Sequence, residues 1–186
     1  TLLAKRTYAH GMRHTDEVYG GVADLTPGSQ AMAYLRVDKT RESLIYRPDR
    51  EAPEAVLTAE SYVLSPHFVN GYLFWVERMA TGWGMRALST DTPPPARVME
   101  PIATKGRPRA LASWRSLSGE PSLLVWEERQ GKSTRVRLVR IQDGEISTPV
   151  DVTDGGFNAY DPACCVTVDG DIVVAYGAFV AGQYRI

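Results

Sequence analysis

Short apolar stretches recur along the chain, and each of them ends in an aromatic residue. They occupy residues 31–34, 72–75, 122–126 and 172–176. The aromatic residues that end them are separated by 41, 51 and 50 positions, and are Tyr34, Trp75, Trp126 and Tyr176. Runs of four to eight residues rich in β-branched and aromatic side chains are typical of β-strands. The pattern therefore predicts one buried strand in each of four similar units.

Turn signals separate these strands from their neighbours. Asn70-Gly71 and Asp169-Gly170 precede two of the apolar stretches, and both dipeptides favour tight hairpins because their residues tolerate a positive φ. A further strand is predicted after each stretch, most clearly at residues 134–140, where polar and apolar residues alternate. Another short strand precedes the first turn, and in the last three units proline opens it, at Pro66, Pro108 and Pro162.

Each unit thus reads as strand, turn, strand, turn, strand, longer link and outer strand. Outer strands are predicted at residues 96–100 and 149–152, and no amphipathic helix of ten or more residues is evident. Four antiparallel strands in about 40–50 residues are typical of a β-propeller blade. A β-sandwich is the alternative, because its strands recur at a similar spacing. The repeated word Trp-x-Glu-Arg, at residues 75–78 and 126–129, favours the propeller.

The predicted fold class is therefore all-β, a β-propeller of about four antiparallel four-stranded blades. It is either a closed small ring or a fragment of a larger propeller. The chain is treated as a single propeller domain, complete or partial, with blade units at about 17–60, 61–106, 107–156 and 157–186. Residues 1–8 are a possible outer strand of the last unit. The chain begins with Thr1 instead of Met, which leads us to expect a fragment.

The last unit, residues 158–176, resembles the repeats of bacterial TolB-like β-propellers. Those repeats read as a proline-initiated strand, an Asp-Gly turn and an apolar strand with an aromatic end. The resemblance holds at the level of single blades and implies a propeller fold, but it implies no particular activity. The chain lacks the Ser-x-Asp-x-Gly-x-x-Trp box of sialidase-type propellers and the Gly-His and Trp-Asp pairs of WD40 blades.

Charge and composition narrow the classes of partner. The 186 residues include 21 Lys and Arg and 22 Asp and Glu, so the formal net charge is −1. Nucleic acids and anionic membranes attract a surplus of basic residues, so we expect no nucleic-acid partner. No apolar run approaches the roughly 20 residues of a membrane span. The two cysteines, Cys164 and Cys165, are adjacent and are expected to be buried, unbridged small side chains. The sequence indicates no cellular location.

Three groups of residues invite a chemical reading and are assigned a structural one. His10 and His14 have the spacing of metal ligands, but Gly11 stands where a metalloprotease has glutamate, so we expect no metal site. Glu77 and Glu128 occupy equivalent places in two units, and pairing with arginine along the hairpin explains both copies. The basic strand with Arg135 and Arg137 is expected to be a solvated face. No cofactor-binding motif is present.

Ligands of propellers bind where the innermost strands and their loops converge on a central channel. The residues expected on those loops are Asp24, His67, Arg109, Tyr160 and Asp161. The first functional hypothesis is a non-catalytic binding or scaffolding module for a protein or carbohydrate ligand. The alternative is part of a propeller hydrolase, either a glycan-active enzyme or the gating propeller of a peptidase whose catalytic domain lies elsewhere. Exposed edges of an open ring would favour self-association.

Overall fold

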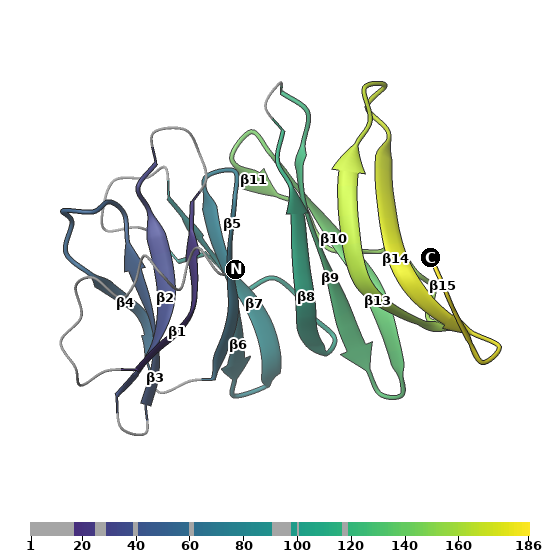
Figure 1. The fold of residues 1–186 in the computed structure, drawn as a ribbon, viewed down its shortest axis with the longest axis horizontal. Helices are drawn as coiled ribbons and strands as arrows, with labels where there is room; N and C mark the ends of the chain where they lie inside the picture. Colours follow the sequence, from purple (N-terminus) through teal and green to yellow (C-terminus); the bar gives the residue numbers. More distant parts are fainter. Residues whose placement is uncertain are drawn as a thin grey trace. The chain divides into compact units, whose positions relative to one another are not determined.

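The computed structural model describes residues 17–24, 29–38, 41–59, 62–90, 98–99, 101–116 and 119–186. Within these residues the chain is all-β, with four antiparallel sheets and no helix (Figure 1). None of the described segments is a helix that is long and apolar enough to cross a membrane. The all-β, antiparallel prediction is confirmed. His10, His14 and the expected strand at 1–8 lie outside the described residues.

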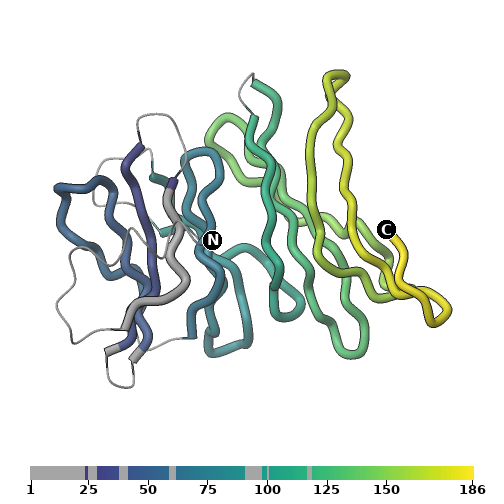
Figure 2. The backbone as a smooth tube through the Cα atoms, viewed as in Figure 1, coloured from purple at the N-terminus to yellow at the C-terminus, as the bar shows by residue number. Residues whose placement is uncertain are grey.

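The chain divides into two compact units, which are described separately. The first comprises residues 1–80 and 86–100, and the second comprises residues 81–85 and 101–186. In each unit the backbone runs through successive antiparallel hairpins (Figure 2). The first unit holds the first sheet and most of the second, and the second unit holds the third and fourth sheets.

The first sheet has the order β1-β2-β3-β4, and the second has the order β5-β6-β7. The strands of the first sheet are β1 (Glu17–Ala23), β2 (Met32–Asp38), β3 (Arg41–Arg47) and β4 (Ala55–Ala59). Those of the second sheet are β5 (Val63–Val69), β6 (Tyr72–Met79) and β7 (Gly82–Ser89). Val98 and Ile102 form isolated antiparallel bridges with β7, in and just beyond the predicted outer strand at 96–100.

The third sheet has five strands, with β11-β10-β9-β8 in order and β12 paired to β10. Its strands are β8 (Arg107–Trp114), β9 (Ser122–Gln130), β10 (Ser133–Gln142), β11 (Glu145–Ile146) and β12 (Val150–Asp151). The fourth sheet has the order β13-β14-β15, with strands β13 (Asn158–Val166), β14 (Ile172–Val180) and β15 (Gln183–Arg185). The sheets therefore hold three to five strands, where four were predicted in each.

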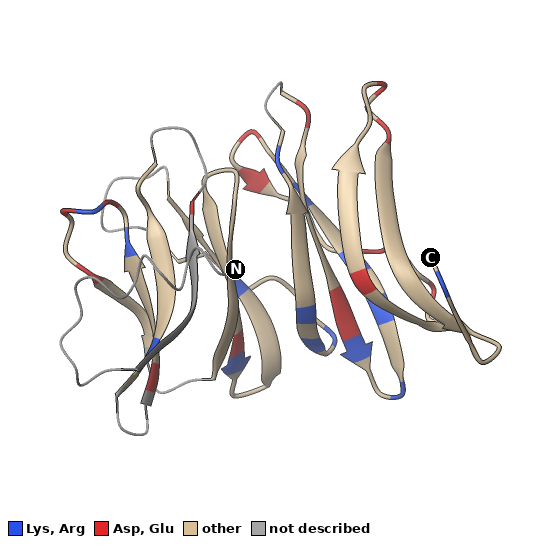
Figure 3. Cartoon of the chain, in the orientation of Figure 1, with Lys and Arg blue, Asp and Glu red and all other residues tan. Residues whose placement is uncertain are grey.

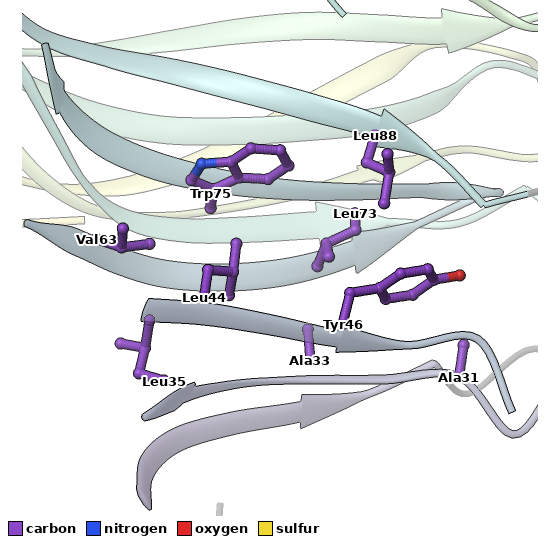
Figure 4. Close-up of a cluster of buried hydrophobic side chains, with 9 residues drawn as sticks. All are labelled: Ala31, Ala33, Leu35, Leu44, Tyr46, Val63, Leu73, Trp75 and Leu88. Atoms are coloured by element: carbon purple, nitrogen blue, oxygen red, sulfur yellow. The ribbon is translucent and has the colours of Figure 1, made fainter. Parts of the chain in front are cut away.

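An apolar core joins the two sheets of the first unit. Side chains of β2 and β3 face those of β6 and β7 (Figure 4). The cluster consists of Ala31, Ala33, Leu35, Leu44, Tyr46, Val63, Leu73, Trp75 and Leu88. Successive residues of a strand point to opposite faces, so Ala33 and Leu35 lie in this core while Tyr34 points to the other face of the sheet.

A second apolar core joins the third and fourth sheets. Leu123 and Val125 of β9 pack, together with Ala112, Trp114, Leu138 and Val152, against the facing side of the fourth sheet. The fourth sheet contributes Cys164, Val166, Ile172 and Val174. Cys164 is thus part of a core as expected. The prediction of a buried side chain is wrong for Cys165, which is exposed because the adjacent residue of a strand points to the opposite face.

Replacing Leu123 by alanine should lower the free energy of unfolding by about 2–5 kcal/mol, because the lost side chain is fully buried between two sheets. Urea unfolding followed by tryptophan fluorescence measures the change. Val168 is 99% exposed, so Val168→Ala is the control and should shift stability by less than about 0.5 kcal/mol. Equal stability of the two variants would contradict the packing described for this core.

Candidate functional site

The first strand of every sheet is interrupted by a β-bulge at the same place. Pairing with the second strand breaks between Tyr19 and Val22 in β1 and between Leu64 and His67 in β5. It breaks between Arg109 and Ala112 in β8 and between Tyr160 and Ala163 in β13. In each case two residues of the first strand lie opposite one residue of the second. The opposing residues are Tyr34, Trp75, Trp126 and Tyr176, the four aromatic residues of the sequence repeat.

Three of these bulges hold a residue other than glycine in the left-handed region of φ. The φ angles are 51° at Ser65, 45° at Ala110 and 48° at Asp161. Such conformations are uncommon for residues with a side chain and cluster at functional sites. A bulge also turns side chains away from the regular pleat, and bulges are frequent beside active sites. The repeated bulges are therefore the candidate ligand-contacting positions of this chain.

Four of the five residues predicted from the sequence lie at these bulges. His67, Arg109 and Tyr160 are the paired residues that border a bulge, and Asp161 occupies one. Arg109 and Asp161 are exposed, whereas His67 and Tyr160 are partly buried. Asp24 lies instead just after β1, where its backbone N–H donates to the carbonyl of Ala31 at 2.9 Å.

Within the second unit, one acidic residue links the bulges of two sheets. Glu127 is the cross-strand partner of Arg109, and its Oε2 accepts a hydrogen bond from the backbone N–H of Asp161 at 3.3 Å. Arg109, Glu127 and Asp161 are named the bulge site below. It offers two carboxylates and a guanidinium, which together supply several hydrogen-bond acceptors and donors.

Sequence reasoning missed Glu127. It is the variable position of the repeated Trp-x-Glu-Arg word, between Trp126 and the repeated Glu128. The alternation of side chains between the two faces of a strand could have identified Glu127 from the sequence. If Trp126 and Glu128 point to one face, Glu127 must point to the other.

His67, which borders the bulge of the second sheet, is mostly removed from water. Burial lowers the pKa of its imidazole below the ordinary value, because removing the ring from water disfavours its charged form. His67 is therefore neutral at pH 7 and presents one ring nitrogen as a donor and the other as an acceptor.

The glutamates of the repeated word serve the sheets themselves. In the second sheet, Trp75 Nε1 donates to Glu77 Oε2 at 3.1 Å, and Arg86 Nε lies 3.2 Å from the same oxygen. In the third sheet, Trp126 Nε1 donates to Glu128 Oε2 at 3.0 Å, and one terminal guanidinium nitrogen of Arg137 lies 3.3 Å from it. The structural reading of both glutamates is confirmed, but the arginines come from the neighbouring strand and not from the word.

Arg137 corrects the prediction of a solvated basic strand. It is only 5% exposed, and its Nε donates to Asp151 Oδ1 at 2.7 Å. Arg135 also pairs with Asp151, at 3.1 Å. Burial alone would raise the pKa of Asp151, but hydrogen bonds and charge from Arg137, Lys105 and Arg135 outweigh burial and lower it. These arginines stabilise the third sheet and are not a free basic patch.

The first sheet also has a cluster of charged residues beside its repeated aromatic residue. Its aromatic residue is Tyr34, whose hydroxyl donates to Glu54 in the loop before β4. Arg36 and Arg47 pair with the same carboxylate at 3.1 and 2.6 Å. Here the strands supply the arginines and the loop supplies the acid, so this cluster also ties a loop to its sheet.

Among the described residues, no group of three or more His, Cys, Asp or Glu side chains is placed to hold a metal ion. No family model matches the sequence, and comparison with curated proteins found no relative. A solved structure that is similar is the endo-arabinase of Bacteroides thetaiotaomicron, with 10% sequence identity and a TM-score of 0.42. The match covers 91% of this chain and 72% of that one. The likeness is too distant to transfer an activity.

His67 should make stability depend on pH between about 5 and 7. The unfolded chain takes up a proton near pH 6.5, whereas the folded imidazole resists it, so the free energy of unfolding should fall as the pH drops through this range. In His67→Gln this slope should be reduced, as measured by urea unfolding at a series of pH values.

The control is Asp151→Asn, which addresses a different range of pH. Because the pKa of Asp151 is lowered, its contribution is present above about pH 4 and is lost on further acidification. This variant should keep the slope between pH 5 and 7 and lose part of the slope below pH 4. An unchanged slope in His67→Gln would refute the assignment to His67.

Proposed function

We propose that this chain forms a β-propeller, or part of one, and serves as a non-catalytic module that binds a polar ligand. The four sheets would be its blades, and their bulged first strands would line the binding surface. One observation carries the proposal: the bulge recurs in all four first strands, opposite the repeated aromatic residue. A feature repeated in this way gives the first strand of every sheet the same local backbone geometry, which supports a shared role for these positions.

The charges of the bulge site support a ligand that carries polar groups. Asp161 and Arg109 are exposed and of opposite charge, and Glu127 lies between them in the network. Such a set can donate to and accept from the hydroxyl groups of a carbohydrate, or pair with polar groups of a protein. Carbohydrate is the ligand to test first, because the site has the donors and acceptors that neighbouring sugar hydroxyls require.

Binding of soluble arabinan, xylan, β-glucan and mannan by isothermal titration calorimetry is the direct test. Asp161→Asn should weaken binding of the recognised glycan at least tenfold, equivalent to about 1.4 kcal/mol. Asparagine tolerates the left-handed conformation found at Asp161, so this change removes the charge and preserves the bulge.

Asp169→Asn is the matched control, because Asp169 is exposed in the turn between β13 and β14 of the same sheet. It makes the same change of charge away from the bulge and should bind as the unaltered chain does. Equal affinities of the two variants would place the ligand elsewhere. Absence of binding to all four glycans would exclude those carbohydrates and turn the search to protein ligands.

A second candidate function is glycoside hydrolysis, and the contact between Glu127 and the Asp161 bulge favours it. Hydrolysis of a glycosidic bond commonly uses two carboxylic groups that flank the bond, one of them as a general acid. If the chain releases reducing sugar from one of the four glycans, Glu127→Gln should lower the rate at least about 100-fold. Retained hydrolysis in that variant would remove Glu127 from the chemistry.

A further inference from the structure

Two arginines lie opposite each other on neighbouring strands of the third sheet, beside the bulge site. Arg107 of β8 is the cross-strand partner of Arg129 of β9, and the next pair on the same face is Arg109 and Glu127. Arg107 and Arg129 are called the arginine pair below. Successive side chains on one face of a strand are about 7 Å apart, so the arginine pair adjoins the bulge site. Figure 3 shows these basic residues in blue at the start of β8 and at the end of β9.

The arginine pair does not stabilise the sheet, because like charges directly across two strands repel each other. In the part of the chain that the structure describes, no carboxylate pairs with Arg107, Arg109 or Arg129. The arginines that serve the sheets do pair with a carboxylate, and they are Arg36, Arg47, Arg86, Arg135 and Arg137. Residues that break a local rule of stability are expected at functional sites.

Arg107 is held in place before any ligand binds. Its guanidinium carbon lies 4.5 Å from the ring centroid of Trp83, which is a cation–π contact within the second unit. Its Nε is buried without a partner, which leaves the two terminal nitrogens to meet a ligand. Gly106 lets the backbone come close to β9, because a Cβ there would overlap the carbonyl of Arg129. A group held in this way loses little freedom on binding.

The guanidinium groups are also accessible. Arg109 and Arg129 are exposed, and Arg107 is partly buried. The Nε of Arg129 donates to the carbonyl of Gly131 at 3.3 Å, so its terminal nitrogens are again the ones that can bind. The planar fork of a guanidinium matches the two oxygens of a carboxylate. The arginine pair therefore has the geometry of a carboxylate-binding site.

The charge of the surface limits the kind of anion. Three guanidinium groups face the two carboxylates of Glu127 and Asp161, which leaves one unit of positive charge. A single carboxylate balances that charge, whereas a doubly charged phosphate exceeds it. The whole chain has a net charge of −1, so long-range attraction does not draw an anion to it. Recognition must come from contacts at the site itself.

We propose that the ligand is an acidic glycan. A uronate carboxylate binds the arginine pair, and the hydroxyl groups of the sugars bind Arg109, Glu127 and Asp161. The inference rests on the proposed binding of carbohydrate at the bulge site and adds the charge of the ligand. Both kinds of contact come from neighbouring positions of β8 and β9, so one short chain of sugars reaches all of them.

Isothermal titration calorimetry with oligogalacturonate and alginate oligosaccharides tests the proposal. At least one of these uronate oligomers should bind, and its affinity should fall as the salt concentration rises. The fully methyl-esterified form of the same oligomer keeps the sugar and removes the charge. It should bind at least about tenfold more weakly. Equal affinity for the acid and its ester would overturn the proposal.

Arg129→Gln should weaken binding of the acidic oligomer at least about tenfold and leave the weaker binding of the ester unchanged. Because Arg129 is exposed and lies opposite a like charge, the change should not destabilise the sheet. Arg140→Gln is the matched control, because it removes the same charge from an exposed residue of β10. It should bind as the unaltered chain does. Equal affinities of the two variants for the acidic oligomer would contradict the assignment.

The outcomes separate this inference from the proposed function. Binding of a neutral glycan but of no uronate oligomer would overturn the inference and leave the proposed function standing. Binding of neither class would remove the carbohydrate ligand, and the inference with it. Binding of a single-stranded DNA oligonucleotide in place of the uronates would assign the arginine pair to phosphate and would also overturn the inference.

Discussion

A hydrogen bond between a buried tryptophan ring and a glutamate two residues later is the constraint on which the second and third sheets depend. Trp75 and Trp126 are fully buried, so each indole N–H needs an acceptor, and Glu77 and Glu128 provide it. A buried carboxylate in turn requires a positive partner. The acceptor that satisfies the buried indole N–H is therefore itself a buried charge that needs a partner.

In the third sheet the partners of the glutamate lie outside the strand that carries the tryptophan. Glu128 is fully buried and accepts the backbone N–H of Lys105 at 2.6 Å, from the segment that leads into β8. Arg137, its partner from β10, also donates to the carbonyl of Ala103 at 3.1 Å and to Asp151 of β12. The Glu128 carboxylate therefore connects β9 directly to the segment before β8, and through Arg137 to the outer strand β12. Removing one member of a buried charge pair usually costs more than the pair contributes.

The repeated aromatic residue also lies opposite the bulge in each sheet. The residue that helps to stabilise the sheet and the bulge proposed to bind a ligand therefore occur at the same position. The residues of the bulges are Gly20-Gly21, Ser65-Pro66, Ala110-Leu111 and Asp161-Pro162. The first bulge residue is different in every sheet and proline recurs only at the second, as Pro66 and Pro162, whereas the opposing aromatic residue is always Tyr or Trp. Only Asp161 among them is charged, which makes the fourth sheet the one with acidic chemistry at its bulge.

Local patterns allowed much of the fold to be predicted. Period-two alternation and Asn-Gly or Asp-Gly turns act over a few residues, and Asn70, Gly71 and Gly170 do take a positive φ. The missed features depend on contacts between distant strands. Nothing near Glu128 shows that its partner is Arg137 and not Arg129, and the exposure of Cys165 depends on whether another sheet lies on its face.

Asp161 combines an acidic side chain with a backbone that a neighbouring sheet holds. Its N–H donates to the Glu127 carboxylate of the third sheet at 3.3 Å. This contact supports the strained, positive φ of Asp161 from outside its own sheet. Geometry at a binding position is most useful when the surrounding structure determines it in advance, because less ordering is left for the ligand to impose. The bulge that carries an acidic side chain is thus also one whose backbone is held by a contact from a second sheet.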